Sequence, residues 1–227
     1  MFVCLNVYMF IAIVPAYNEE KTIGSVARDL FGHVDKVVVV DDGSEDKTSE
    51  VARSAGAAVL RHKINRGQGA ALQTGDECAL KLGADYVLHF DADGQFNTAD
   101  IKPALEKLKN EKADVLFGSR FFDSRSNVPF FKRRFLLPAA RLINFLFTGV
   151  SLSDVHNGFR ILNRNALEKI AITHDRMAHA SEILSQIKKC GLKCIEFPVK
   201  VLYKEYGQGM RGGVEVVKDL LLGRFIK

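Results

Sequence analysis

Long apolar stretches are missing from this chain of 227 residues. No run of about 18 apolar residues occurs, although a helix needs that length to span a bilayer. Residues 1–14 are apolar, but they lack the basic start and the small-residue cleavage site of a signal peptide. The sequence therefore predicts no helix that crosses a membrane.

Cysteine is also scarce. The four cysteines, Cys4, Cys78, Cys190 and Cys194, are scattered and match neither a redox motif nor a zinc finger, so we expect reduced thiols in the cytosol. Hydrophobic residues make up 47% and charged residues 26% of the chain, which is typical of a globular protein. No repeat or linker interrupts the chain, and we predict one α/β domain over residues 1–227.

Acidic residues are almost absent from residues 120–134. Asp123 stands alone there against Arg120, Arg125, Lys132, Arg133 and Arg134. Phosphorylated ligands, anionic lipid or nucleic acid would each suit such a segment, and an ordinary solvated face remains an alternative. Nucleic acid is the weakest candidate, because no strand interleaves aromatic with basic residues.

Short apolar runs alternate with helical patterns along the chain. The runs Phe10–Val14 and Val37–Val40 predict strands, and Pro15 is expected to end the first. Further strands are expected at residues 57–61, 85–90, 115–117, 159–162 and 193–204, the last at a sheet edge because it contains Pro198. Runs without polar alternation are typical of strands covered on both faces. We therefore predict a mostly parallel sheet between two layers of helices.

Two carboxylates, Asp91 and Asp93, follow the strand expected at residues 85–90. Ligands of an open α/β sheet bind beyond the carboxyl ends of its strands, and oxygen ligands suit Mg²⁺ or Mn²⁺ shared with a diphosphate. An EF-hand is excluded, because Phe96 and Lys102 stand where its glycine and glutamate belong. A plain turn with a solvated Asp91 remains the alternative.

Residues 65–72 form a glycine-rich entry to a helix. A helix start of this kind presents N–H groups to an anion. The segment is not a dinucleotide fingerprint, because Leu72 stands where the third glycine belongs.

Five short motifs, taken together and in order, resemble family two of the glycosyltransferases. They are Pro15-Ala-Tyr-Asn-Glu19, Val40-Asp-Asp-Gly-Ser44, Asp91-Ala-Asp-Gly-Gln95, Gly118-Ser-Arg120 and Asn157-Gly-Phe159. The resemblance is greatest to the dolichyl-phosphate mannose synthase and polyprenyl-phosphate sugar synthase branch, and it covers nearly the whole chain from Phe10. It implies a GT-A fold, a nucleotide-sugar donor (GDP- or UDP-sugar), a divalent metal (Mg²⁺ or Mn²⁺), and transfer of one sugar to a polyprenyl or dolichyl phosphate.

The resemblance also implies roles for individual residues. The nucleotide-sugar would be held by Pro15, Tyr17, Glu19, Val40, Asp42, Gln68 and Asp91, within a donor-binding half at residues 10–120. Asp91, Asp93 and Gln95 would handle the metal and the diphosphate. Arg120 and Lys132 match basic positions near the phosphates, including that of the acceptor, and residues 121–227 would form the acceptor-binding half. Glu182 matches an acid near the sugar, so the implied catalytic residues are Asp91, Asp93, Arg120 and Glu182.

The sequence departs from the family pattern at two places. A basic residue is common where Gln68 stands, and residues 203–212 lack the serine-lysine pair of mannose synthases. The sugar of the donor therefore remains open.

The chemistry of the implied reaction needs no strong base, because a lipid phosphate is already deprotonated at neutral pH. We expect a direct, inverting displacement in which positioning and electrostatic stabilisation of the leaving diphosphate dominate. A transferase acting on a non-lipid acceptor would instead need a base such as Asp154 or Glu182. A catalytically silent nucleotide-binding module is the other alternative. His156 and His179 are interpreted as supporting, structural histidines.

Two segments suggest contact with a membrane surface. Residues 130–147 and 214–227 pair bulky apolar side chains with lysine and arginine. Core packing is the alternative explanation for both. We expect peripheral association with the cytoplasmic face of the membrane, through these segments or through a small membrane subunit.

Overall fold

The computed structural model describes residues 8–121, 152–155, 157–173 and 179–202. Its centre is a sheet whose strands run in the order β3-β2-β1-β4-β6-β5-β7. The strands are β1 (Phe10–Ala16), β2 (Lys36–Asp41), β3 (Ala58–Arg61), β4 (Tyr86–His89), β5 (Val115–Ser119), β6 (Arg160–Asn163) and β7 (Cys194–Pro198). Only β6 runs antiparallel to its neighbours among these strands, so the prediction of a mostly parallel sheet is confirmed.

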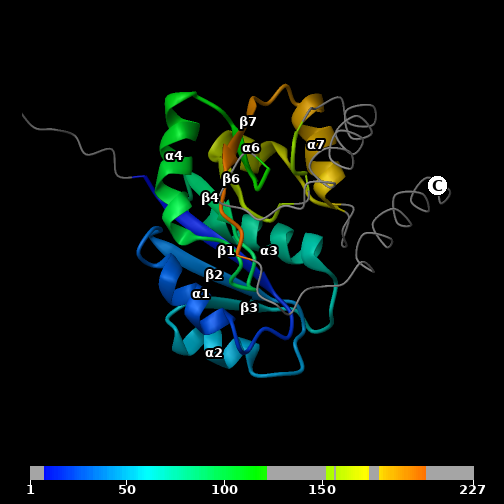
Figure 1. Ribbon diagram of the computed structural model, residues 1–227. Helices are drawn as coiled ribbons and strands as arrows, with labels where there is room; N and C mark the ends of the chain where they lie inside the picture. Colours follow the sequence, from blue (N-terminus) through cyan, green and yellow to red (C-terminus); the bar gives the residue numbers. More distant parts are fainter. Residues whose placement is uncertain (1–7, 122–151, 156, 174–178, 203–227) are drawn as a thin grey trace, which may run out of the picture.

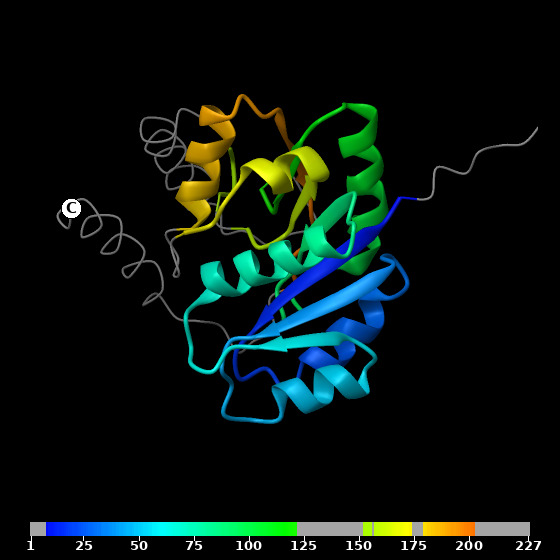
Figure 2. The same ribbon diagram turned by 180° about the vertical axis from the view of Figure 1, so that it is seen from behind.

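Helices cover both faces of the sheet (Figures 1 and 2). They are α1 (Ile23–Leu30), α2 (Thr48–Ser54), α3 (Gln68–Lys81), α4 (Ile101–Asn110), which follows the 3₁₀ turn η1 (Thr98–Asp100), α6 (Arg164–Lys169) and α7 (His179–Lys189). The apolar sides of α1, α2 and α4 pack on one face, and those of α3, α6 and α7 pack on the other. Helix α6 was not predicted from the sequence, because its six residues are too few to show a helical periodicity.

Strand β1 lies inside the sheet, between β2 and β4, and its side chains are apolar on both faces. Phe10 and Val14 face the α1 side, whereas Ile11 and Ile13 face the α3 side. Helix α3 lies directly against the strand, since a Cβ atom added at Gly75 would stand 2.2 Å from Cγ2 of Ile13. Because both faces are dry, no position of β1 favours a polar residue.

Pro15 does not end β1, contrary to the prediction, and the strand continues to Ala16. Pro15 pairs in register with Val40 of β2, but the pairing of β1 with β4 already stops at Ile13 and His89. The carbonyl of Ile13 accepts the N–H of Phe90, on the side of β1 that faces β4. The backbone groups of residues 13 and 15 point to the same side of the strand, so an N–H at position 15 would also face the β4 side. The missing N–H of Pro15 therefore falls where no ladder partner is required.

Strand β7 lies at the edge of the sheet, as its proline predicts, but it is shorter than expected and ends at Pro198. Beyond it, Val201 forms an isolated bridge with Phe96, and the N–H of Leu202 donates to the carbonyl of Gln95. This contact ties the segment after β7 to the loop that carries Asp91 and Asp93.

Within the part of the chain that the structure describes, no helix is both long and apolar enough to cross a membrane. Lys132 and the two segments expected to touch a membrane surface, residues 130–147 and 214–227, lie outside the described residues, as does His156. Their expected roles remain predictions.

Candidate active site

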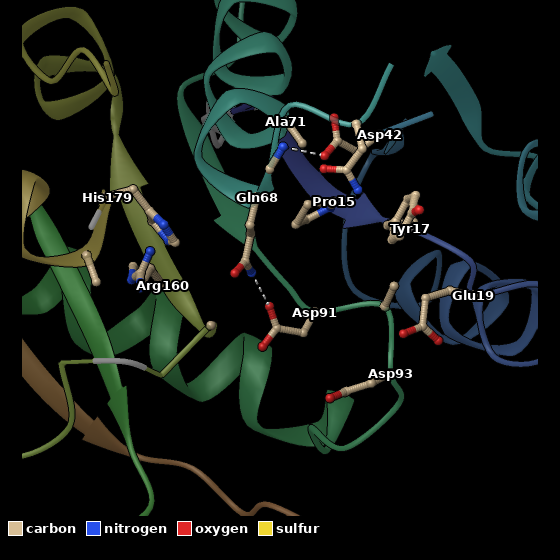
Figure 3. Close-up of a pocket in the computed structure, with 16 residues that line it drawn as sticks. Pro15, Tyr17, Glu19, Asp42, Gln68, Ala71, Asp91, Asp93, Arg160 and His179 are labelled. Atoms are coloured by element: carbon tan, nitrogen blue, oxygen red, sulfur yellow. Dashed lines mark hydrogen bonds between the residues drawn. The ribbon is translucent and has the colours of Figure 1, made fainter. Parts of the chain in front are cut away.

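A pocket of about 470 Å³ opens at the carboxyl ends of β1, β2 and β4 (Figure 3). Seven residues expected from the sequence line it: Pro15, Tyr17, Glu19, Asp42, Gln68, Asp91 and Asp93. Pro15, Tyr17, Glu19 and Asp42 form one side, here called the β1–β2 wall. Gly158, Arg160, His179 and Ala180 form the other side, here called the β6–α7 wall, and Asp91 lies between the two.

Hydrogen bonds join the loops that follow β1 and β2. The N–H of Asn18 donates to Oγ of Ser44 (2.9 Å), and the N–H of Glu45 donates to Oδ1 of Asn18 (2.9 Å). The N–H of Glu19 donates to Oγ1 of Thr48 (2.8 Å). Asn18 holds a positive φ of 56°, a conformation that asparagine tolerates better than most residues. These bonds fix the backbone directly after Tyr17, a residue that is 43% exposed and lines the pocket.

Asp42 organises the glycine-rich segment before α3. Its carboxylate accepts the N–H groups of Arg66 (2.9 Å) and Gly67 (2.6 Å), and Nδ1 of His62 lies 2.7 Å from its Oδ1. The two N–H groups that precede the helix are therefore occupied by a carboxylate of the protein. Gly67 adopts a φ of 98°, which explains the need for glycine at this turn.

The two acids after β4 occupy a short turn. Oδ1 of Asp91 accepts a hydrogen bond from Nε2 of Gln68 (3.0 Å), and Oδ1 of Asp93 accepts the N–H of Gln95 (3.0 Å). Burial, and then the charge of Asp93, raises the pKa of Asp91 to about 6, although Arg160, Gln68 and Arg120 act in the opposite direction. The carboxylate of Asp91 is thus held in a position where its negative charge is costly.

Gly158 lets the start of β6 approach this turn. A Cβ atom at residue 158 would stand 2.0 Å from Oδ2 of Asp91, closer than any real contact. Beneath the turn, Phe90, Phe96 and Phe159 meet edge to face, with ring centroids 5.5 to 6.2 Å apart. The Asn157-Gly-Phe159 motif therefore has a structural meaning: its glycine makes room for Asp91 and its phenylalanine supports the turn from below.

Arg160 was not singled out by sequence analysis, yet it lines the pocket and is only 2% exposed. It stands opposite His89 of β4 and Phe117 of β5, and its guanidinium carbon lies 5.9 Å from the centroid of the Phe117 ring. Burial lowers the pKa of Arg160, while the nearby charges of Asp91, Asp154 and Asp76 act to raise it. The available signal was an arginine inside an apolar strand, since arginine is rarely buried without a reason.

The sequence was also compared with models of known protein families. The sequence model described as glycosyl transferase family 2 matches residues 11–171. The chain belongs to this family. This family 2 glycosyltransferase is 40% identical over 212 residues to an uncharacterised protein of Methanocaldococcus jannaschii. The match covers 90% of this chain and 85% of that protein.

A second relative has a named activity. The chain is 32% identical over 236 residues to the UDP-N-acetylglucosamine–dolichyl-phosphate N-acetylglucosaminyltransferase of Methanococcus voltae, with 92% of this chain and 94% of that enzyme covered. Among solved structures, it resembles glucosyl-3-phosphoglycerate synthase of Mycobacterium tuberculosis in complex with Mn²⁺ and UDP-glucose, with a TM-score of 0.69 at 19% identity. That match covers 96% of this chain and 79% of the other. The protein is a glycosyltransferase with the GT-A fold.

Other residues expected from the sequence lie away from the lining of this glycosyltransferase pocket. Val40 is fully buried in the apolar core, and Gln95 lies in the turn after Asp93. Arg120 follows β5, where its Nε and Nη2 atoms donate to the two carboxylate oxygens of Asp154 at 2.7 and 3.1 Å. Glu182 of α7 accepts the N–H and hydroxyl of Thr173.

Asp91 and Asp93 provide the oxygen atoms that a divalent metal of this family would need. Burial, and then the charge of Asp93, raises the pKa of Asp91, and a cation bound beside the two carboxylates would favour their charged forms. In the described ranges, no group of three or more histidine, cysteine, aspartate and glutamate side chains is arranged to hold an ion. Magnesium is commonly held by one or two carboxylates together with substrate phosphates. The pair therefore fits an ion shared with a bound diphosphate.

Proposed function

We propose that this glycosyltransferase moves a sugar from a nucleoside diphosphate sugar to a polyprenyl phosphate, with a divalent ion held by Asp91 and Asp93. The observation that carries the proposal is the pocket itself. It combines an ordered β1–β2 wall with two carboxylates at the end of β4. A nucleoside against Pro15, Tyr17 and Asp42 would direct its diphosphate toward Asp91 and Asp93.

The residues of the chain would bind and orient the donor. The joined loops keep Tyr17 and Glu19 in place before the donor arrives, so less entropy is lost on binding. Gln68 holds the Asp91 carboxylate by its amide. A bound Mg²⁺ or Mn²⁺ would stabilise the charge of the departing nucleoside diphosphate.

The two candidate bases, Asp154 and Glu182, are engaged in hydrogen bonds, which favours an acceptor that is already an anion. Asp154, one candidate base, is 5% exposed and accepts hydrogen bonds from Arg120 and Asn157. Glu182, the other, is bonded to Thr173. A phosphate acceptor attacks without help from either, which agrees with the named activity of the Methanococcus voltae relative.

The same relative supports a uridine nucleotide as the donor and a dolichyl-type lipid as the acceptor. Such a lipid keeps its chain in the bilayer, so the enzyme would work at the membrane surface. The test is a transfer assay with radiolabelled UDP-sugars, Mn²⁺ and a polyprenyl phosphate. We expect label in the organic-solvent extract, and label found only in free sugar would contradict the proposal.

A further inference from the structure

Arg160 carries a charge for which the described part of the protein supplies no bonded partner. Its Nε atom is buried without a hydrogen bond, and no carboxylate of the described residues forms an ion pair with its guanidinium. Arginine stays protonated in proteins, and a buried charge without a partner destabilises the folded state. A bound anion would remove this destabilisation.

The surroundings of Arg160 tolerate the charge without bonding to it. Asp76 is occupied by His89, whose Nε2 lies 2.8 Å from Oδ1 of Asp76, and both side chains are buried. Asp154 is occupied by Arg120 at 2.7 Å. These carboxylates and Asp91 favour the charged form of Arg160 from a distance. The guanidinium thus keeps its donors for the pocket that it lines.

The two arginines near the pocket differ in this respect. Arg120 is bonded to both oxygens of Asp154, whereas Arg160 faces the pocket beside His179 and across from the β1–β2 wall (Figure 3). Gly158 allows the segment before β6 to approach Asp91 closely. Arg160 and Asp91, a proposed metal ligand, therefore line the same cavity. A planar guanidinium in this position is suited to two oxygen atoms of one phosphate group.

We propose that Arg160 binds a phosphate group of a bound substrate from the β6–α7 wall. This inference rests on the proposed function, which provides two sources of phosphate: the diphosphate of the donor and the phosphate of the acceptor. An anion is required rather than a sugar hydroxyl, because only a negative charge offsets the burial of the guanidinium. Arg160 would therefore contact a phosphate group at the reacting centre.

The first arm of the test measures thermal unfolding without ligand. We expect Arg160→Met to unfold at the same temperature as the natural protein or higher, since methionine removes an unpaired buried charge. Arg120→Met is the matched control. It leaves the 5% exposed Asp154 without its guanidinium, so it should lower the unfolding temperature. A marked drop for Arg160→Met would point to a structural arginine and count against the proposal.

The second arm measures binding of two soluble probes by calorimetry: UDP with Mn²⁺ for the donor, and a short-chain prenyl phosphate for the acceptor. Loss of charge-assisted hydrogen bonds should weaken the relevant probe about 10- to 100-fold in Arg160→Met. Weakening of UDP alone assigns the donor diphosphate, and weakening of the prenyl phosphate alone assigns the acceptor. Weakening of both places Arg160 between them.

Unchanged binding of both probes to Arg160→Met would overturn the proposal. If this variant does not fold, Arg160→Gln replaces it, because glutamine removes the charge but keeps polar N–H groups. Binding of both probes to Arg160→Gln as tight as to the natural protein would likewise overturn it. Neither arm requires sugar transfer. Absent lipid glycosylation with lost phosphate binding would therefore reject the proposed function and leave the role of Arg160 standing.

Discussion

The two walls of the pocket are prepared to different degrees. On the β1–β2 wall, Asp42 is bonded to the backbone of residues 66 and 67, and the loops after β1 and β2 are joined to each other. On the β6–α7 wall, Arg160 is buried without an ion pair to any described carboxylate. The first wall is complete before a ligand arrives, whereas the second requires an anion. Under the proposed function, the β1–β2 wall would bind the donor and the β6–α7 wall would contact a phosphate group.

The largest effect should come from removing a carboxylate between the walls. We expect Asp93→Ala to reduce transfer about 1,000-fold, because the metal would lose one of its two protein ligands. The fold should stay intact, since Asp93 is partly exposed in a turn. Steady-state transfer rates and a melting curve measure both effects. Near-normal transfer with a normal melting curve would exclude a metal role for Asp93.

The next prediction concerns the contact between the walls. Gly158→Ala would place a Cβ atom 2.0 Å from the Asp91 carboxylate, so either Asp91 or the start of β6 must move. We expect transfer to fall about 100-fold, as when one catalytic group is displaced. Gly32→Ala is the matched control, because its Cβ would meet only the carbonyl of Asp29 at 3.7 Å. Equal activity of the two variants would show that the close approach has no functional role.

A third prediction tests whether residues 132–134 contact the membrane surface. Lys132, Arg133 and Arg134 lie outside the described residues, and each basic residue near an anionic surface contributes about 1 kcal/mol. Changing all three to serine should weaken binding to anionic vesicles about 100-fold, as measured by co-sedimentation at low salt. Affinity for UDP with Mn²⁺ should not change. Unaltered transfer to a long-chain lipid phosphate would argue against membrane contact through this segment.

A smaller effect is expected on the β1–β2 wall. Asp42→Ala removes the acceptor of two backbone N–H groups and the partner of His62. The glycine-rich segment before α3 should loosen, and UDP binding should weaken about 10-fold by calorimetry. The affinity for a prenyl phosphate should remain as it is. If binding of the prenyl phosphate alone were affected, the proposed binding of the donor on the β1–β2 wall would be wrong.

Local patterns in the sequence predicted the parallel strands and the acids at their ends. The apolar run Val37–Val40 predicts a strand, and Asp42 follows it directly, so the sequence alone places Asp42 at the carboxyl end of β2, where the pocket lies. The contacts of Arg160 are different in kind. Strand β6 inserts antiparallel between β4 and β5, and this places Arg160 beside His89 and Phe117, which are far away in the sequence.

The same non-local pairing explains what else sequence analysis could not reach. The clash that defines Gly158 involves Asp91, and the bidentate bond that occupies Arg120 involves Asp154 across 34 positions. Neither of these two contacts can be predicted from the periodicity or the composition of the sequence. The family resemblance marked Gly158 and Arg120 as motif positions, but their physical roles depend on the packing of β6 against β4 and β5.

The central claim, sugar transfer to a lipid phosphate, is tested most directly by one measurement. The natural protein and Asp93→Ala are incubated with radiolabelled UDP-sugar, Mn²⁺ and a polyprenyl phosphate, and the label in the organic extract is counted. We predict label in the lipid with the natural protein, at least 100-fold less with Asp93→Ala, and none when the lipid lacks its phosphate. Equal labelling of a lipid alcohol, or label only in water-soluble products, would contradict the account.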